Sequence, residues 1–93
     1  MTDNNKMTSA EIAMSKHGFF FLKQYEIRVD ENVSHPVITY ARFVDNERTL
    51  YDMTVTFDCA QKSIEFWQKK SETVFVEPYV LEAIVERAHE LKM

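Results

Sequence analysis

The sequence predicts an α+β domain: a four-stranded antiparallel β-meander packed by a C-terminal α-helix, with a short N-terminal helix. Three observations support this prediction. Polar and apolar side chains alternate over several segments between residues 19 and 70, which is the period of a strand. Short clusters of turn residues separate these segments at lengths typical of hairpins between antiparallel neighbours. Residues 78–92 instead repeat their apolar positions every three or four residues, as a helix does.

The length of 93 residues allows one hydrophobic core but not two. Hydrophobic residues make up 45% and charged residues 28% of the chain, which indicates a globular domain rather than a disordered segment. Residues 1–7 are mostly polar and lack any period, so we expect a flexible N-terminal segment there. Residues 8–93 are then predicted to form a single domain.

The N-terminal helix is predicted from its two ends. Thr8 and Glu11 have the spacing of a capping box, in which each side chain accepts a hydrogen bond from the other residue's backbone N–H. Gly18 is the only glycine of the chain, and it follows Lys16 and His17 at the left-handed position that commonly ends a helix. We therefore expect a short helix that begins after Thr8 and ends at Gly18.

The first strand is predicted to begin at Phe19 and to end at the turn residues 30–32. Its alternation places Phe21, Tyr25, Ile27 and Val29 on one face and Gln24, Glu26, Arg28 and Asp30 on the other. Pro36 opens the second strand, which runs over residues 37–44. Apolar residues on both faces of this segment indicate a strand in the interior of the sheet.

The third strand has the clearest pattern and follows a turn predicted at residues 45–47. Apolar residues at 51, 53, 55, 57 and 59 alternate with polar ones. A short connection leads to the fourth strand, residues 63–70, in which Ile64 and Phe66 share one face. Glu65, Trp67 and Lys69 share the other face.

The C-terminal helix is predicted to run from Pro78 to about Lys92. Proline suits the first position of a helix, and Glu77 suits the positive charge of the helix N-terminus. An apolar stripe is expected to cover one face of the sheet: Leu81, Ile84, Val85, Ala88 and Leu91. An acidic stripe is expected on the opposite side: Glu82, Glu86 and Glu90.

The residue types disfavour an enzyme. With one glycine in the chain, no segment can form the glycine-rich loop with which nucleotide-binding enzymes hold phosphates. The three histidines are isolated, so we predict no metal site, no cofactor and no catalytic residue. A role for Cys59 as a nucleophile is the alternative, but its place on an apolar face predicts a buried thiol with a raised pKa.

Charge and cysteine content predict the localisation of the protein and the class of partner that it binds. A single cysteine, no signal-peptide pattern and no apolar run longer than residues 19–22 predict a cytoplasmic protein without a membrane span. The formal net charge is −4, of which residues 71–93 carry −3. A negative field of this kind disfavours direct binding of nucleic acid.

We predict binding surfaces because one helix can cover only one face of the sheet. The open face is expected to display types that dominate binding hot spots: Arg28, Tyr40, Arg42, Trp67 and Lys69. Cross-strand packing that merely stabilises the sheet explains these residues equally well. The acidic stripe Glu82, Glu86 and Glu90 has the spacing to imitate a phosphate backbone, although a solvated helix face would look the same.

The predicted function is that of a small acidic non-enzymatic binding protein, of the inhibitor or adaptor type, which acts by protein–protein contact through the open sheet face and the acidic helix. The partner is a protein of unknown identity, and the acidic stripe would fit a nucleic-acid-binding protein. Exposed edge strands also allow self-association into a homodimer. The alternative is a sheet module that binds single-stranded nucleic acid.

Overall fold

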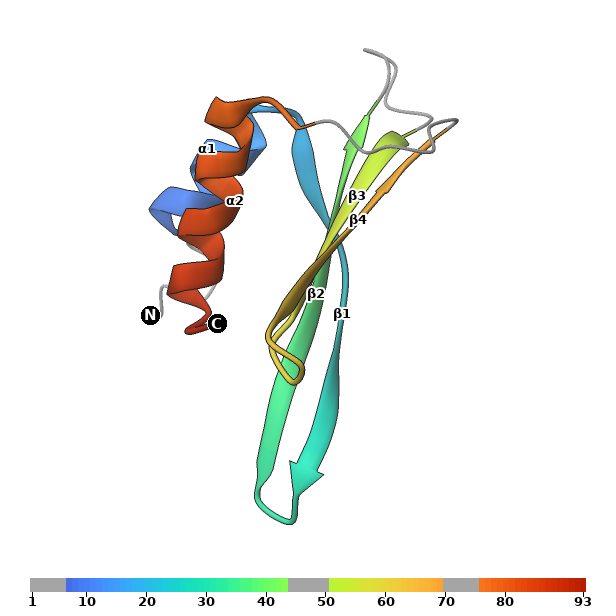
Figure 1. Ribbon diagram of the computed structural model, residues 1–93, viewed down its shortest axis with the longest axis vertical. Coiled ribbons are helices and arrows are strands. Elements are labelled where there is room, and N and C mark those ends of the chain that lie inside the picture. The colour runs from blue at the N-terminus through green and yellow to red at the C-terminus, as the bar shows by residue number, and fades with distance from the viewer. Residues whose placement is uncertain (1–6, 44–50, 70–75) are drawn as a thin grey trace, which may run out of the picture.

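A four-stranded antiparallel sheet with both helices on one of its faces makes up the part of the chain that the computed structural model describes, residues 7–43, 51–69 and 76–93 (Figure 1). The elements are α1 (Ser9–Lys16), β1 (Phe19–Asp30), β2 (Val33–Phe43), β3 (Tyr51–Asp58), β4 (Ser63–Gln68) and α2 (Pro78–Glu90). The strands lie in the order β1-β2-β3-β4, and every neighbouring pair is antiparallel. The predicted α+β meander is therefore confirmed.

Some predictions fall outside the described residues. Except for Met7, the expected flexible segment 1–7 lies outside the described residues. The turn predicted at residues 45–47 also lies outside them. The predicted ends of the second and fourth strands, at residues 44 and 70, lie there too.

Both ends of α1 are as predicted. Thr8 Oγ1 accepts a hydrogen bond from the backbone N–H of Glu11 at 3.2 Å, and the Glu11 carboxylate accepts one from the backbone N–H of Thr8 at 3.3 Å. Gly18 follows the C-cap His17 with a φ of +90°, which only glycine adopts without strain. A Cβ at this position would also lie 3.2 Å from Cγ of Arg42. The glycine is therefore required both by the backbone and by the space around it.

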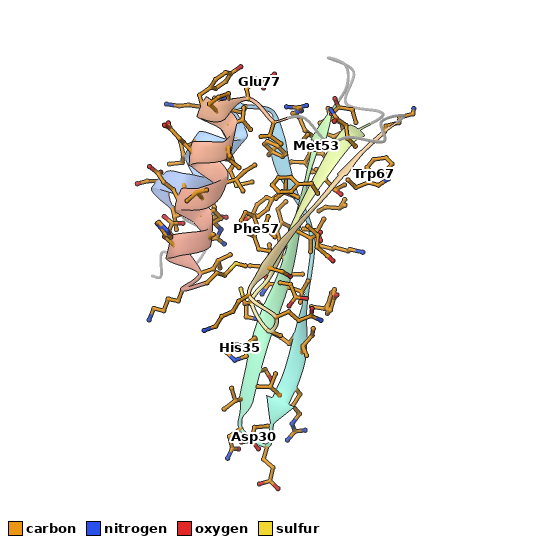
Figure 2. The ribbon with its side chains drawn as sticks, in the orientation of Figure 1. Asp30, His35, Met53, Phe57, Trp67 and Glu77 are labelled. Carbon is orange, nitrogen blue, oxygen red and sulfur yellow. The ribbon has the colours of Figure 1, made fainter. Side chains whose placement is uncertain are left out.

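The covered face of the sheet forms the core. Met53, Val55 and Phe57 of β3 are fully buried and pack with Ile38 of β2 and Ile84 of α2. Figure 2 shows the side chains of Met53 and Phe57 between the sheet and the helices. The strict alternation of β3 thus turns its apolar side chains toward the helices, as the sequence predicts.

The buried stripe of α2 is only partly the predicted one. Ile84 and Ala88 are buried as expected, together with Val80 and Ala83, but Leu81 and Val85 are exposed. The helix is rotated because its inner side packs against α1 as well as against the sheet (Figure 1). A helix that packs against both another helix and a sheet buries a different set of side chains from a helix that packs against a sheet alone.

β1 contains a bulge that changes the faces of its side chains. Phe21 lies opposite Tyr40 and Lys23 lies opposite Thr39, so Leu22 is the extra residue. An extra residue reverses the alternation beyond it. Tyr25 and Ile27 therefore lie on the uncovered face, and Gln24, Glu26 and Arg28 on the helix side. The face assignment predicted for β1 is wrong over residues 24–28, and a second register shift between Arg28 and Asp30 interrupts the alternation again at the tip.

The hairpin of β1 and β2 extends beyond the rest of the sheet as a two-stranded arm, residues 26–36 (Figure 1). The pairing of β2 with β3 ends at Val37 and Asp58, whereas β1 and β2 continue to pair as far as Asp30 and Val33. Arg28 stabilises the tip because its guanidinium donates to the backbone carbonyls of Asp30 and Glu31, at 3.3 and 2.7 Å. The arm thus protrudes without a helix or a third strand beside it in the described part of the chain.

Candidate binding surface on the uncovered sheet face

The sheet face turned away from the helices is uncovered within the described residues, and we call it the open face. Figure 2 shows Trp67 on this side, pointing away from α1 and α2. The side chains of the main sheet and the adjoining hairpin that the strand register places here include Phe20, Lys23, Tyr25, Ile27, Val37, Thr39, Ala41, Thr54, Thr56, Glu65 and Trp67.

Small side chains form the centre of the open face and aromatic rings lie around it. Thr39 and Ala41 are buried although no layer covers them, and the hydroxyls of Thr39 and Thr56 are 3.0 Å apart. The rings of Phe20 and Phe43 stack at one side, with their centroids 4.2 Å apart. On the last strand Trp67 is 49% exposed. The centre of the open face is therefore made of small uncharged side chains with aromatic rings around it.

The arm continues this surface with apolar side chains. Val29 and Val33 are exposed, as is Tyr25 directly before the arm, and the strand register places Tyr25 and Val33 on the same side as the open face. Two paired strands alone are marginally stable in water. An arm that keeps large apolar side chains in solvent is therefore a segment that gains from contact with another molecule.

The prediction that Tyr40 and Arg42 lie on the open face is wrong. Tyr40 is 4% exposed and packs beneath the helices, where its hydroxyl accepts a hydrogen bond from Nε of Arg87 at 3.1 Å and donates to Oε2 of Glu11 at 3.4 Å. Burial raises the pKa of Tyr40, an effect that Arg87 partly offsets. Tyrosine can lie inside because its hydroxyl finds these partners.

Arg42 also lies on the helix side. Its guanidinium is 3.4 Å from the Asp52 carboxylate and 5.6 Å from the centre of the Phe19 ring, so it is engaged at the end of the core. Because β2 has apolar residues on both faces, its sequence pattern does not show which face turns toward the helices. The direction was set by partners from α1, α2 and β3, which no local pattern reveals.

The acidic stripe of α2 is reduced to two residues. Glu90 accepts hydrogen bonds from Thr8 Oγ1 at 2.6 Å and from the backbone N–H of Ala10 at 3.5 Å, and it pairs with Arg87 at 3.2 Å. Desolvation alone would raise the pKa of Glu90, but the hydrogen bonds from Thr8 and Arg87 outweigh it and lower the pKa. Glu90 therefore joins α2 to the beginning of α1, while Glu82 and Glu86 remain exposed.

The eight predicted partner-binding residues are thus not gathered in one place. Arg28 supports the tip of the arm, Lys69 is exposed directly after β4, and Trp67 belongs to the open face. Glu82 and Glu86 border a shallow depression on the outer side of α2. The residues that the prediction missed are Tyr25 and Val33. Four consecutive apolar residues, 19–22, conceal the bulge that puts Tyr25 on this face.

Cys59 is buried, and burial together with the neighbouring Asp58 carboxylate raises the pKa of its thiol. This agrees with the prediction of a buried thiol with a raised pKa. Within residues 7–43, 51–69 and 76–93, no three histidine, cysteine, aspartate or glutamate side chains come together as metal ligands would. No described helix has the length and apolar character needed to cross a membrane.

No protein-family model, curated protein or solved structure matches the chain.

Proposed function

We propose that the protein is a non-enzymatic binding protein of the inhibitor or adaptor type, and that its protein partner contacts the open face. The observation that carries this proposal is an uncovered sheet face on which Trp67 and Tyr25 are about half exposed, at 49% and 52%. Exposed apolar patches on soluble proteins mark interaction sites, and tryptophan and tyrosine supply much of the binding energy at such sites.

The charges of the open face favour a protein over single-stranded nucleic acid. Lys23 and Glu65 are charged side chains of this face, and the neighbouring Lys69 and Asp58 also have opposite charges. A surface that binds single strands combines stacking rings with a positive groove along the phosphates. The rings are present here, but the opposite charges offset one another instead of forming a positive groove, and the chain as a whole has a net charge of −4.

The arm enlarges the surface available to a partner. A stable protein interface buries about 800 Å² on each side. The open face extends over the four strands of the sheet. The arm adds the exposed side chains of its valines to the surface that a partner can contact. Such an arm can lie along a partner while the aromatic rings of the sheet fill its pockets.

The exposed pair Glu82 and Glu86 is a second contact, on α2, which lies on the opposite side of the sheet from the open face (Figure 1). Two carboxylates one helical turn apart suit a basic protein surface, including that of a nucleic-acid-binding protein. The two surfaces point in opposite directions, so an adaptor could use both at once.

The experiment is affinity capture of a partner from the lysate of the native cell by full-length protein. We expect Trp67→Ser combined with Tyr25→Ser to abolish capture of that partner, because both substitutions remove exposed rings of the open face. The matched control is Leu81→Ser combined with Tyr79→Ser, which removes exposed apolar side chains of α2 instead. Circular dichroism shows whether each variant is folded.

Capture that survives the open-face substitutions but is lost in the α2 variant contradicts the choice of surface. Titration with mixed single-stranded oligonucleotides tests the alternative, since base stacking on the half-exposed Trp67 would quench its fluorescence. Sedimentation velocity tests the predicted homodimer, which the open-face substitutions should dissociate.

A further inference from the structure

A cleft of about 330 Å³ opens on the helix side of the sheet, between α1 and the start of β1. Met14 of α1 and Phe19 and Phe21 of β1 form its apolar walls, and Glu11 and Tyr40 provide its polar groups. Phe21 is 54% exposed although it lies on the face that the helices cover. The helices thus leave a recess beside the edge strand β1, and Phe20 of the open face reaches the same edge.

The size and lining of the cleft match a small-molecule site. Such sites are concave and mostly apolar, have volumes of about 300 to 1,000 Å³, and carry a few polar groups that orient the ligand. A dry cavity of about 150 Å³ already holds a benzene molecule. The cleft therefore has room for one ring with a short side chain.

The charge at the cleft is negative. Among the described residues that line it, Glu11 is the only charged one. Behind it, Arg87 lies 3.9 Å from Glu11 and 3.2 Å from Glu90, so two carboxylates share one guanidinium. Tyr40 adds no charge, because burial raises the pKa of its hydroxyl. The cluster of Glu11, Arg87 and Glu90 thus has a charge of −1.

Glu11 also has hydrogen-bonding capacity for a ligand. Its Oε1 accepts from the backbone N–H of Thr8 at 3.3 Å, while the Thr8 hydroxyl donates to Glu90 at 2.6 Å, and Oε2 accepts one long bond, at 3.4 Å, from Tyr40. A carboxylate offers about four acceptor positions. A further donor placed in the cleft can therefore bind Oε2.

We propose that this cleft binds a small aromatic or aliphatic molecule that carries a primary ammonium group. The apolar part would lie against Phe21 and Met14, and the ammonium would pair with Glu11. The aromatic rings of the walls add cation–π attraction to the same end of the ligand. An anionic ligand is excluded by the carboxylate, and a neutral one leaves the negative charge uncompensated.

The test uses 2-phenylethylamine as the probe and 2-phenylethanol as its neutral counterpart, titrated into the full-length protein near pH 7 and followed by amide NMR shifts. A probe of this size is expected to bind with a dissociation constant on the order of 1 mM. The amide signals of Ser15 and Phe21 should move and saturate. The alcohol should bind about tenfold more weakly, because it lacks the charge.

Glu11→Gln is the decisive variant, because glutamine retains the capping box while it removes the charge. It should weaken binding of the amine about tenfold or more. The matched control is Glu82→Gln combined with Glu86→Gln, which removes two exposed carboxylates elsewhere and should leave binding unchanged. The absence of saturable shifts at Ser15 and Phe21, equal binding of amine and alcohol, or unchanged binding in Glu11→Gln would each overturn the proposal.

Discussion

Tyr40→Phe removes a single hydroxyl from the place where the sheet meets both helices. The ring stays, so its packing against Phe57 and Phe21, at centroid distances of 5.7 and 6.2 Å, is retained. What is lost is the acceptor for Arg87 Nε at 3.1 Å and the donor to Glu11 at 3.4 Å. The substitution therefore isolates the polar contribution of this buried residue.

The expected loss of stability follows from these two hydrogen bonds. A hydrogen bond to a charged group contributes about 1.5 to 3 kcal/mol, and a long one contributes little. Arg87 keeps its ion pair with Glu90 at 3.2 Å, so its guanidinium is not left without a partner. We therefore expect the free energy of unfolding to fall by about 1.5 kcal/mol, near the low end of that range.

The measurement is urea unfolding followed by far-UV circular dichroism. With a slope of about 1 to 1.5 kcal/mol per molar urea for a domain of this size, the midpoint should fall by about 1 to 1.5 M. Tyr25→Phe is the matched control, because it removes the same atom from an exposed side chain on the open face. A Tyr40→Phe midpoint within about 0.3 M of this control would refute the reasoning.

Three further predictions follow from individual contacts. Gly18→Ala should lower the free energy of unfolding by about 1 to 2 kcal/mol, measured by thermal unfolding, because a φ of +90° and a Cβ 3.2 Å from Arg42 Cγ both oppose a side chain. The pKa of Glu90 is lower in the folded than in the unfolded chain, so its contribution to stability is present above about pH 4.3 and is lost as the pH falls through the folded pKa. Glu90→Gln should therefore flatten the loss of stability below about pH 5, and an unchanged acid profile would contradict the contact with Thr8. Cys59, which is buried and has a raised thiol pKa, should react with iodoacetamide at least about tenfold more slowly in the native protein than in urea, whereas equal rates would show an accessible thiol.

The local signals in the sequence predicted the elements and the ends of the helices well, but Pro36 did not mark the start of the second strand, because β2 begins at Val33. Thr8 with Glu11 marked the start of α1, Gly18 marked its end, and Pro78 marked the start of α2. These positions depend on backbone hydrogen bonds and φ values within a few residues, so the residues nearby are sufficient to specify them. The antiparallel order of the strands followed from short connections for the same reason.

The candidate binding surface was predicted less well. An open face with Trp67 on it was anticipated, but Tyr40 and Arg42 were assigned to it, and Tyr25 was not. Alternation predicts which residues share a face only until a bulge interrupts it. The bulge at Leu22 lies inside a run of apolar residues, where an extra residue leaves no trace in the pattern.

The sequence by itself determined which segments are helix and strand, where they end, and that one sheet face would be left uncovered. Tertiary structure decided which side chains face the helices. It turned Tyr40 inward toward Arg87 and Glu11, and it rotated α2 so that Leu81 and Val85 are exposed. The physical reason is the range of the interactions. Caps and turns are satisfied by neighbours in the chain, whereas a buried hydroxyl or guanidinium is satisfied by partners tens of residues away, which only the folded chain brings together.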